Sequence, residues 1–211
     1  RDDSFVRNYK KANASQYKTR KAFILKGEKL PYGGFGTICG FLSVAQLKKI
    51  SKEKYHTSIN NYLIACFIYA VYQAHPGKIT KDHPVRIAVP VNLRPYFSSN
   101  TTKNFFVMIS AEFYPEKNEY TFEDIMEITK DSIESQKTKE NLEAIFSYNV
   151  SNSEILAARA VPLPIKNLAM LYVYNRAALA NTTTITNIGN VKVLPEYENY
   201  IESFYSFLPF S

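Results

Sequence analysis

Two short apolar segments rich in valine and isoleucine, residues 85–91 and 104–113, constrain the fold of this 211-residue chain more than any other feature. Asn92 directly follows the first segment, and Pro115 ends the second. Apolar runs of this length, bounded by polar or turn-forming residues, are typical of strands that lie in the middle of a sheet with both faces covered. The sequence therefore predicts a largely buried sheet that contains both segments.

Helical patterns flank these two segments. Ser43 followed by Gln46, and Thr121 followed by Asp124, have the spacing of N-terminal capping boxes, so a helix is expected to begin at each place. The segment 57–74 is apolar on nearly every side, which predicts a helix at the centre of the fold. The expected helices cover about residues 43–54, 57–74, 121–133, 139–157 and 164–180, the last with Pro164 in its first turn.

Four further segments are expected to be extended. Residues 22–26 and 37–42 are short apolar runs around a glycine-rich loop, and residues 182–186 and 191–193 are β-branched runs around the bend at 187–189. Strands and helices thus follow one another in a mixed order. The predicted fold class is α/β with α+β layering, that is, a mixed sheet flanked by helices.

The net charge of +7 is concentrated at the start of the chain. Residues 1–21 contain seven basic residues against Asp2 and Asp3, and the remainder is close to neutral. We interpret residues 1–21 as a basic connector and residues 22–211 as the folded unit. Because the charge is not spread over the domain, nucleic acid is not an expected partner. A basic, tyrosine-rich nucleic-acid binder stays an alternative, and salt-dependent retention on nucleic acid would support it.

The sequence contains neither a metal-binding nor a disulfide pattern. Its two cysteines, Cys39 and Cys66, lie in separate apolar segments, which fits a reducing, cytoplasmic compartment. The longest apolar run, residues 62–72, is well short of the roughly 20 residues that a membrane span needs, so a buried helix is expected there. The chain begins at Arg1 and ends in an apolar stretch, and we expect it to be part of a longer protein.

No complete catalytic motif is present. The three histidines, His56, His75 and His83, lie at expected helix ends or in loops, outside any HHxxxDG, HExxH or HxxxH pattern. The sequence also has no GxSxG nucleophile elbow and no GxGxxG dinucleotide loop. The residues alone therefore indicate no catalytic machinery.

Polar residues directly follow the segment 85–91. Asn92 and Arg94 stand where a buried strand ends, a place from which side chains commonly enter a site. We expect Arg94 to be buried and paired with a carboxylate or with backbone carbonyls, because a buried guanidinium needs partners. The alternative role is a structural ion pair that tethers a loop.

A second polar segment is the threonine-rich stretch 182–189. Strand alternation would place Thr182, Thr184 and Thr186 on one face, and Thr183, Ile185 and Asn187 on the other. A row of hydroxyls can donate hydrogen bonds to developing negative charge, as an oxyanion site requires. An ordinary threonine-rich strand that closes in a turn stays the alternative.

These segments together resemble a known group of enzymes. Pro90-Val-Asn-Leu-Arg94 with Asn104-Phe-Phe106, and then Thr184-Ile-Thr-Asn-Ile-Gly189, resemble the C-terminal half of alcohol acetyltransferase-like members of the chloramphenicol acetyltransferase and condensation-domain superfamily. The two helical segments that precede them, residues 43–48 and 57–65, are similar to that family as well. The resemblance covers roughly residues 35–208 and depends on the order and spacing of the motifs.

The resemblance implies one lobe of a two-lobed CoA-dependent acyltransferase fold. Between the lobes of such enzymes runs a tunnel in which an acyl thioester and an alcohol or amine acceptor meet. Thr184, Thr186, Asn187 and Gly189 would line this tunnel, and a hydroxyl there would help to stabilise the tetrahedral oxyanion. Asn92, Arg94 and Asn104 would be structural.

The catalytic base of that family lies outside this chain. The base is the histidine of HHxxxDG in the N-terminal lobe, so the resemblance implies a partner lobe and an isolated chain without activity. Acyl-CoA would be a co-substrate, and no permanently bound cofactor is expected. A catalytically silent binding or assembly module of the same fold is the alternative.

Overall fold

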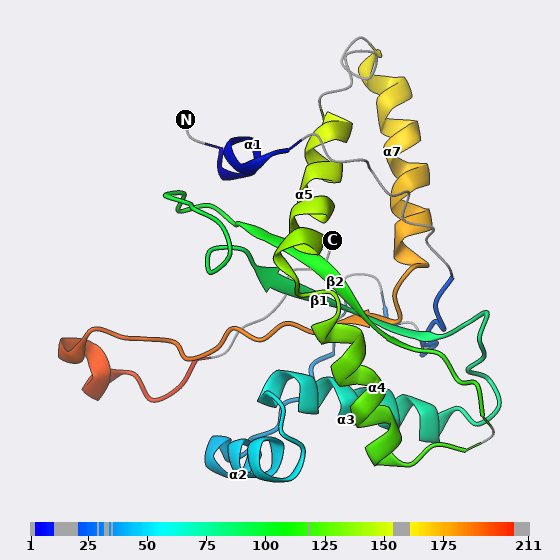
Figure 1. The fold of residues 1–211 in the computed structure, drawn as a ribbon, viewed down its shortest axis with the longest axis vertical. Coiled ribbons are helices and arrows are strands. Elements are labelled where there is room, and N and C mark those ends of the chain that lie inside the picture. Colours follow the sequence, from blue (N-terminus) through cyan, green and yellow to red (C-terminus); the bar gives the residue numbers. More distant parts are fainter. Residues whose placement is uncertain are drawn as a thin grey trace.

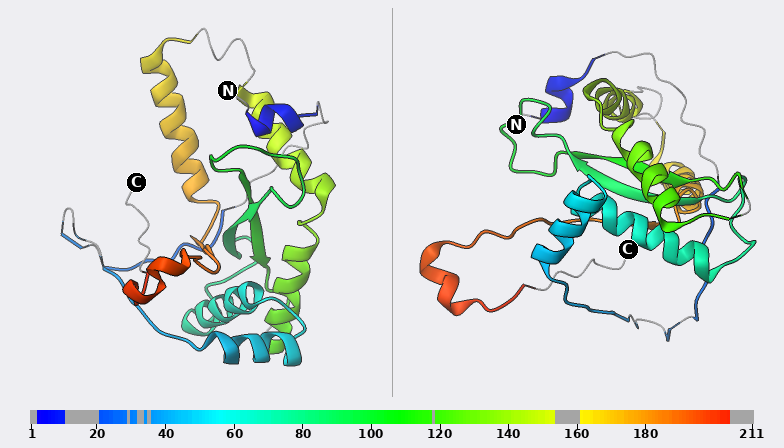
Figure 2. Two further views of the ribbon diagram at one scale, coloured as in Figure 1. Left: turned by 90° about the vertical axis from the view of Figure 1, so that its left-hand side faces the viewer. Right: turned by 60° about the horizontal axis from the view of Figure 1, so that its bottom comes forward.

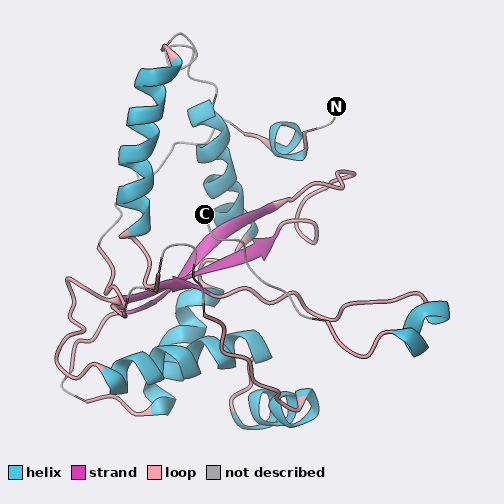
Figure 3. Ribbon diagram, turned by 180° about the vertical axis from the view of Figure 1, so that it is seen from behind, coloured by secondary structure: helices cyan, strands magenta, loops and turns pink. Residues whose placement is uncertain are grey.

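A computed structural model gives the arrangement of the chain (Figure 1), and it describes residues 3–10, 21–28, 30, 31, 34, 36–117, 119–153 and 161–204. A small sheet lies between two groups of helices (Figure 3). Helices α3 (Ile59–Ala74) and α4 (Phe122–Glu134) cover one face, and α5 (Lys139–Ser153) and α7 (Leu163–Ala178) lie on the other side. The predicted mixed sheet flanked by helices is confirmed.

Three strands form the sheet, in the order β2-β1-β3. Strand β1 (Val85–Asn92) pairs with β2 (Phe106–Phe113) in antiparallel register, so that Val85 is opposite Phe113 and Asn92 is opposite Phe106. Strand β3 (Thr183–Thr184) runs parallel to β1, with Thr184 opposite Ala88. Both strands predicted from the valine- and isoleucine-rich segments are therefore confirmed.

The inner face of the sheet, which we define by Ile87, Val89, Ile109 and Ala111, forms the main core. Against it pack the buried side chains Ile64 and Ile68 of α3 and Ile125 and Ile133 of α4. Full burial of one such side chain stabilises the fold by about 1.5–3 kcal/mol. Helix α3 thus buries one face beside α4 and is half-buried elsewhere, rather than being surrounded at the centre of the fold.

The free edge of β2 is closed by side chains of α4 and the turn after it. The backbone N–H of Glu112 donates to Ser132 Oγ over 3.0 Å, and the N–H of Ser110 donates to Gln136 Oε1 over 3.2 Å. Gln136 Nε2 donates in return to the Ser110 carbonyl over 2.7 Å. Because unpaired edge groups invite further strands, these contacts protect this edge from pairing with another chain.

Both predicted capping positions are confirmed. Ser43 Oγ accepts from the Gln46 N–H at the start of α2 (Val44–Lys49), which continues as a π-helix at Ile50–Lys54. Thr121 and Asp124 form a reciprocal capping box at the start of α4. The Lys117 ammonium and the hydrogen bonds from Thr121 lower the pKa of Asp124 to about 2.

Several predicted strands are wrong. Residues 22–26 and 37–42 form no strand in the part of the chain that the structure describes, nor do residues 191–193. The backbone N–H groups of Ala22 and Phe23 instead bond to the carbonyls of Leu179 and Pro84. The side chain of Ile38 is fully exposed, so nothing in the described chain pairs with or covers that segment. An apolar segment thus does not become a strand unless the edge of a sheet is available for it to pair with.

The start of the connector is packed rather than solvated. Helix α1 (Ser4–Asn8) places the Phe5 ring 4.8 Å from the Phe105 ring and 6.3 Å from the Phe146 ring, next to α5. The rest of the connector, residues 11–20, lies outside the described residues, as do the expected end of the helix at 154–157 and the C-terminal residues 205–211.

The last described part of the chain lies away from the sheet. Past residue 190 the chain projects away from it and carries the 3₁₀ turn η2 (Pro195–Tyr200), as Figure 2 shows. No helix in the described ranges combines the length and apolar character needed to cross a bilayer.

Candidate functional site

The outer face of the sheet carries the first predicted site residue. We define this face by Arg86, Ala88 and Pro90 of β1 and by their partners in the β1–β2 register, which are Glu112, Ser110 and Met108. Because Thr184 is the strand partner of Ala88, its side chain belongs to this same face.

Its neighbour Ile185 belongs to the opposite face and packs against the core. The predicted alternation is thus confirmed for Thr184 and Ile185. The remaining outward position, Thr186, lies beyond β3 and is exposed.

Strand β3 is held in place by β1. The Thr182 N–H donates to the Arg86 carbonyl over 2.7 Å, and the Arg86 N–H donates to Thr182 Oγ1 over 3.1 Å. The Ile185 N–H donates to the Ala88 carbonyl over 3.0 Å. The hydroxyl of Thr182 is therefore used to start the strand, whereas Thr184 has no hydrogen bond from its side chain within the described residues.

An apolar cavity of about 590 Å³ opens beside this face, between β2, α5 and the end of α7. Its walls include Phe106 and Met108 of the sheet and Ile145 and Tyr148 of α5. Carboxamides stand among these apolar groups, and one of them, Asn181, comes shortly before β3. A concave apolar surface with a few polar groups is the usual form of a small-molecule site.

Arg94 is exposed, so the expectation that its side chain is buried is wrong. The predicted pairing with backbone carbonyls is confirmed: Arg94 Nη2 donates to the Lys103 carbonyl over 2.7 Å and to the Thr101 carbonyl over 3.2 Å. Asn92 Oδ1 accepts from the Arg94 N–H over 3.1 Å. These contacts tether the β1–β2 loop, in which Asn104 is also exposed. The group is structural in its contacts and lies away from Thr184.

The buried arginine of this fold is Arg86, which sequence reasoning missed. Its side chain is 4% exposed, and its Nη2 lies 2.7 Å from Glu112 Oε1, in the directly opposite position on β2. Glu112 Oε2 also accepts from the Tyr114 hydroxyl over 2.6 Å. The sequence did contain a signal for this pair: an arginine and a glutamate each lie inside an apolar segment that predicts a strand. Opposite charges at such positions pair across neighbouring strands.

Asn187 and Gly189 follow β3 and are joined by a local hydrogen bond. The Gly189 N–H donates to Asn187 Oδ1 over 2.8 Å, and Gly189 has a φ of 76°, a conformation that glycine adopts without strain. The predicted bend is not found, because residues 185–194 form neither a turn nor a bend nor a second strand. Both residues are exposed, and neither they nor Thr184 line the outer-face cavity, whose lining ends at Asn181, just before β3.

Helix α7 carries large apolar side chains on every side, with Lys166, Asn167, Asn175 and Arg176 between them, and none of its residues is buried. Leu168 is 69% exposed, Leu171 56% and Tyr172 62%. Figures 1 and 2 show the helix rising from the outer side of the sheet and standing apart from it over most of its length. The helix therefore presents an extended apolar surface to solvent in this structure.

The histidines and cysteines form no chemical site. His56 has a positive φ of 47°, His75 follows the end of α3, and no three His, Cys, Asp or Glu residues of the described chain could together hold a metal ion. Burial raises the pKa of the Cys66 thiol, which opposes formation of a reactive thiolate.

Comparison with known proteins identifies no relative: no protein family model, no curated protein and no solved structure matches this chain. A functional proposal therefore depends on the outer face, its cavity and α7, together with the sequence motifs.

Proposed function

We propose that this chain is the C-terminal lobe of an acyltransferase that moves an acyl group from a coenzyme A or carrier thioester to an alcohol or amine. The catalytic histidine would come from an N-terminal lobe that carries HHxxxDG. The observation that carries the proposal is the position of Thr184, on the same face of the sheet as an apolar cavity of about 590 Å³. An acyl chain needs apolar walls, and a reacting thioester carbonyl needs a donor beside it.

In this reaction the acceptor hydroxyl or amine gives its proton to the histidine and attacks the thioester carbonyl carbon. The carbonyl oxygen then carries negative charge in the tetrahedral intermediate, and the thiolate of the donor leaves and takes up the proton. The Thr184 hydroxyl would donate to that oxygen, because its hydrogen-bonding capacity is not used within the described residues. Apolar walls around the acyl chain would exclude water from the competing hydrolysis.

The exposed surface of α7 supports a two-lobed arrangement. The helix lies on the outer side of the sheet and its leucine and tyrosine side chains are exposed, so an N-terminal lobe that contacts this helix would close the space above the outer face. Such closure would remove water from the site and cover the apolar helix at once. The same surface also fits the alternative proposal, a silent assembly module of this fold, and activity distinguishes the two.

The 211-residue chain alone and the same chain joined to an N-terminal lobe that carries HHxxxDG should differ in acyltransferase activity. With acetyl-CoA and a panel of primary alcohols, the 211-residue chain alone is expected to release no free thiol above background, because its histidines lie outside the motif. The same chain joined to its HHxxxDG lobe is expected to release thiol only in the presence of an acceptor. Thiol release by the isolated chain that disappears in a His56, His75 or His83 variant would contradict the proposal, and an inactive joined protein would favour the assembly module.

A further inference from the structure

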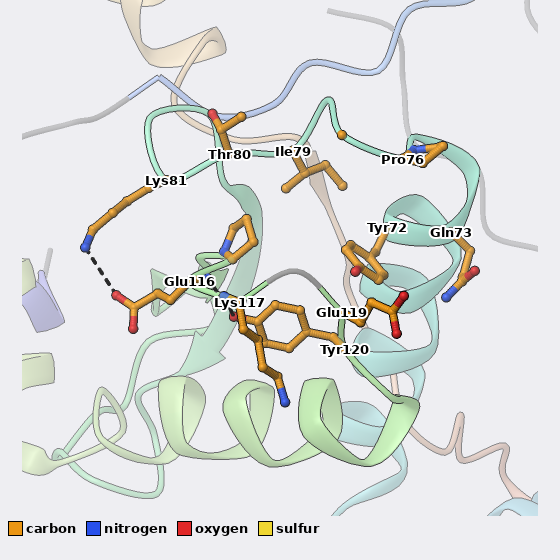
Figure 4. A pocket seen from close by; sticks show the side chains of 12 residues that line it. Tyr72, Gln73, Pro76, Ile79, Thr80, Lys81, Glu116, Lys117, Glu119 and Tyr120 are labelled. Atoms are coloured by element: carbon orange, nitrogen blue, oxygen red, sulfur yellow. Dashed lines mark hydrogen bonds and ion pairs between the residues drawn. The ribbon is translucent and has the colours of Figure 1, made fainter.

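A second cavity lies at the other end of the sheet, between the end of α3 and the connection from β2 to α4 (Figure 4). It has a volume of about 680 Å³, and its walls include Tyr72, Ile79 and Tyr120. The two cavities border opposite ends of β2, which are on the order of 20 Å apart at about 3.4 Å per residue. The inference drawn from this cavity therefore does not rest on the acyl-transfer proposal.

The walls of this cavity are fixed by contacts within the chain. The Tyr120 hydroxyl accepts from the N–H of Glu116 over 2.6 Å and from the N–H of Lys117 over 3.1 Å, which ties the β2–α4 connection to a buried ring. The Tyr72 and Tyr120 rings pack edge to face at 5.9 Å. Because these groups are already held in place, a ligand would meet a preformed aromatic wall.

Both lysines of the lining are paired with carboxylates, and one glutamate of the lining is not paired with any residue that the structure describes. Lys81 Nζ lies 3.2 Å from Glu116 Oε1, and Lys117 Nζ lies 2.9 Å from Asp124 Oδ1. Glu119, in contrast, has no hydrogen bond or ion pair with any residue that the structure describes. Figure 4 shows Glu119 beside the Tyr72 ring and close to Gln73, and Lys117 pointing away from the centre of the cavity.

The end of α3 adds to this negative potential. The helix is 16 residues long and ends at Ala74, next to the lining residues Pro76 and Gly77. The C-terminus of a helix carries partial negative charge and favours cations nearby. The Tyr120 ring already holds one cation, because Lys117 Nζ lies 4.8 Å from the ring centroid. Glu119 and the helix end favour a further cation, and the apolar side chains of the lining favour an apolar stem on it.

We infer that this cavity binds an alkylammonium group, with its methylene stem against Ile79 and the tyrosine rings and its ammonium at the Glu119 carboxylate. The ammonium would donate a charge-assisted hydrogen bond to Glu119, and the stem would displace water from the apolar floor. The positive charges of Lys81 and Lys117 do not oppose this binding strongly, because each is paired with a carboxylate. A free diamine and a lysine side chain of a peptide both present this group.

The test compares n-butylammonium with n-butanol, which has nearly the same shape and no charge. Both are titrated into the ¹⁵N-labelled chain, and the amide shifts of Gln73, Gly77 and Glu119 are followed by NMR. We expect saturable shifts at these amides with n-butylammonium, and at least about fivefold weaker binding of n-butanol. Glu119→Gln should weaken n-butylammonium binding by about fivefold, because it removes the charge and keeps the shape.

The matched control is Glu53→Gln, which removes the same charge from an exposed position on the π-helix and should leave the affinity unchanged. Equal affinity for n-butylammonium and n-butanol, or unchanged affinity in Glu119→Gln, would overturn the inference. Butane-1,4-diammonium and Nα-acetyl-lysine-N-methylamide then distinguish the two sources by their dissociation constants. Failure of both probes to shift these amides would contradict the inference as well.

Discussion

An Arg86→Ala protein is expected to lose about 3 kcal/mol of its free energy of unfolding. Arg86 Nε and Nη2 lie 3.0 and 2.7 Å from Glu112 Oε1, and the arginine side chain is 4% exposed. Removing the guanidinium leaves the Glu112 carboxylate without this partner at a position that is only 21% exposed. Urea unfolding of the two proteins measures the difference.

Two control variants show whether burial of the pair causes this loss. Lys81→Ala removes a pair whose side chains are 67% and 69% exposed, and should change the free energy of unfolding by less than about 0.5 kcal/mol. Arg86→Met combined with Glu112→Leu should recover most of the stability, because no unpaired charge remains. An Arg86→Ala protein with an unchanged urea midpoint would show that the pair does not hold β1 and β2 together.

Replacing Thr184 with Val in the joined two-lobe protein should lower kcat by about 100-fold with little change in KM. Valine keeps the shape of threonine and removes only the hydroxyl that would donate to the oxyanion. Steady-state kinetics with acetyl-CoA and a saturating alcohol measure both constants. The expected split follows because the oxyanion forms only after the substrate is bound.

Thr183→Val is the matched control for that variant. Thr183 is the strand partner of Ile87, so its side chain belongs to the inner face, away from the cavity. Its replacement should leave kcat within about twofold, because it alters the same strand without touching the site. If the Thr184→Val and Thr183→Val proteins have equal kcat values, the threonines serve only to form the strand. The oxyanion donor then belongs to another part of the protein.

The parts of the fold that were predictable are those fixed by local signals. The apolar segments that became β1 and β2 and the capping pairs Ser43–Gln46 and Thr121–Asp124 depend on neighbours within a few residues. Residues 37–42 failed as a strand because a strand also needs an edge to pair with, and that requirement is not local.

The candidate site was less predictable for the same reason. The side to which Thr184 points followed from strand alternation. The cavity on that side of the sheet lies between β2, α5 and the end of α7, and no sequence period specifies how these helices pack. Arg94 was expected to be buried because it follows a buried strand. Its position in the β1–β2 loop instead gives it carbonyl partners in solvent, and the buried role belongs to Arg86 inside β1. A charged residue within an apolar strand segment was therefore a better indicator of a buried arginine than a charged residue just after the strand.

The most direct test of the account is whether the outer-face cavity, on the sheet face that carries Thr184, holds an acyl chain. Titrating S-hexanoyl-pantetheine into the ¹⁵N-labelled chain should shift the amides of the lining residues Met108, Ala144 and Asn181. An Ala144→Phe variant, which fills the cavity, should abolish those shifts. Shifts confined to other parts of the chain, or shifts that persist in Ala144→Phe, would contradict the assignment of this cavity to the acyl group.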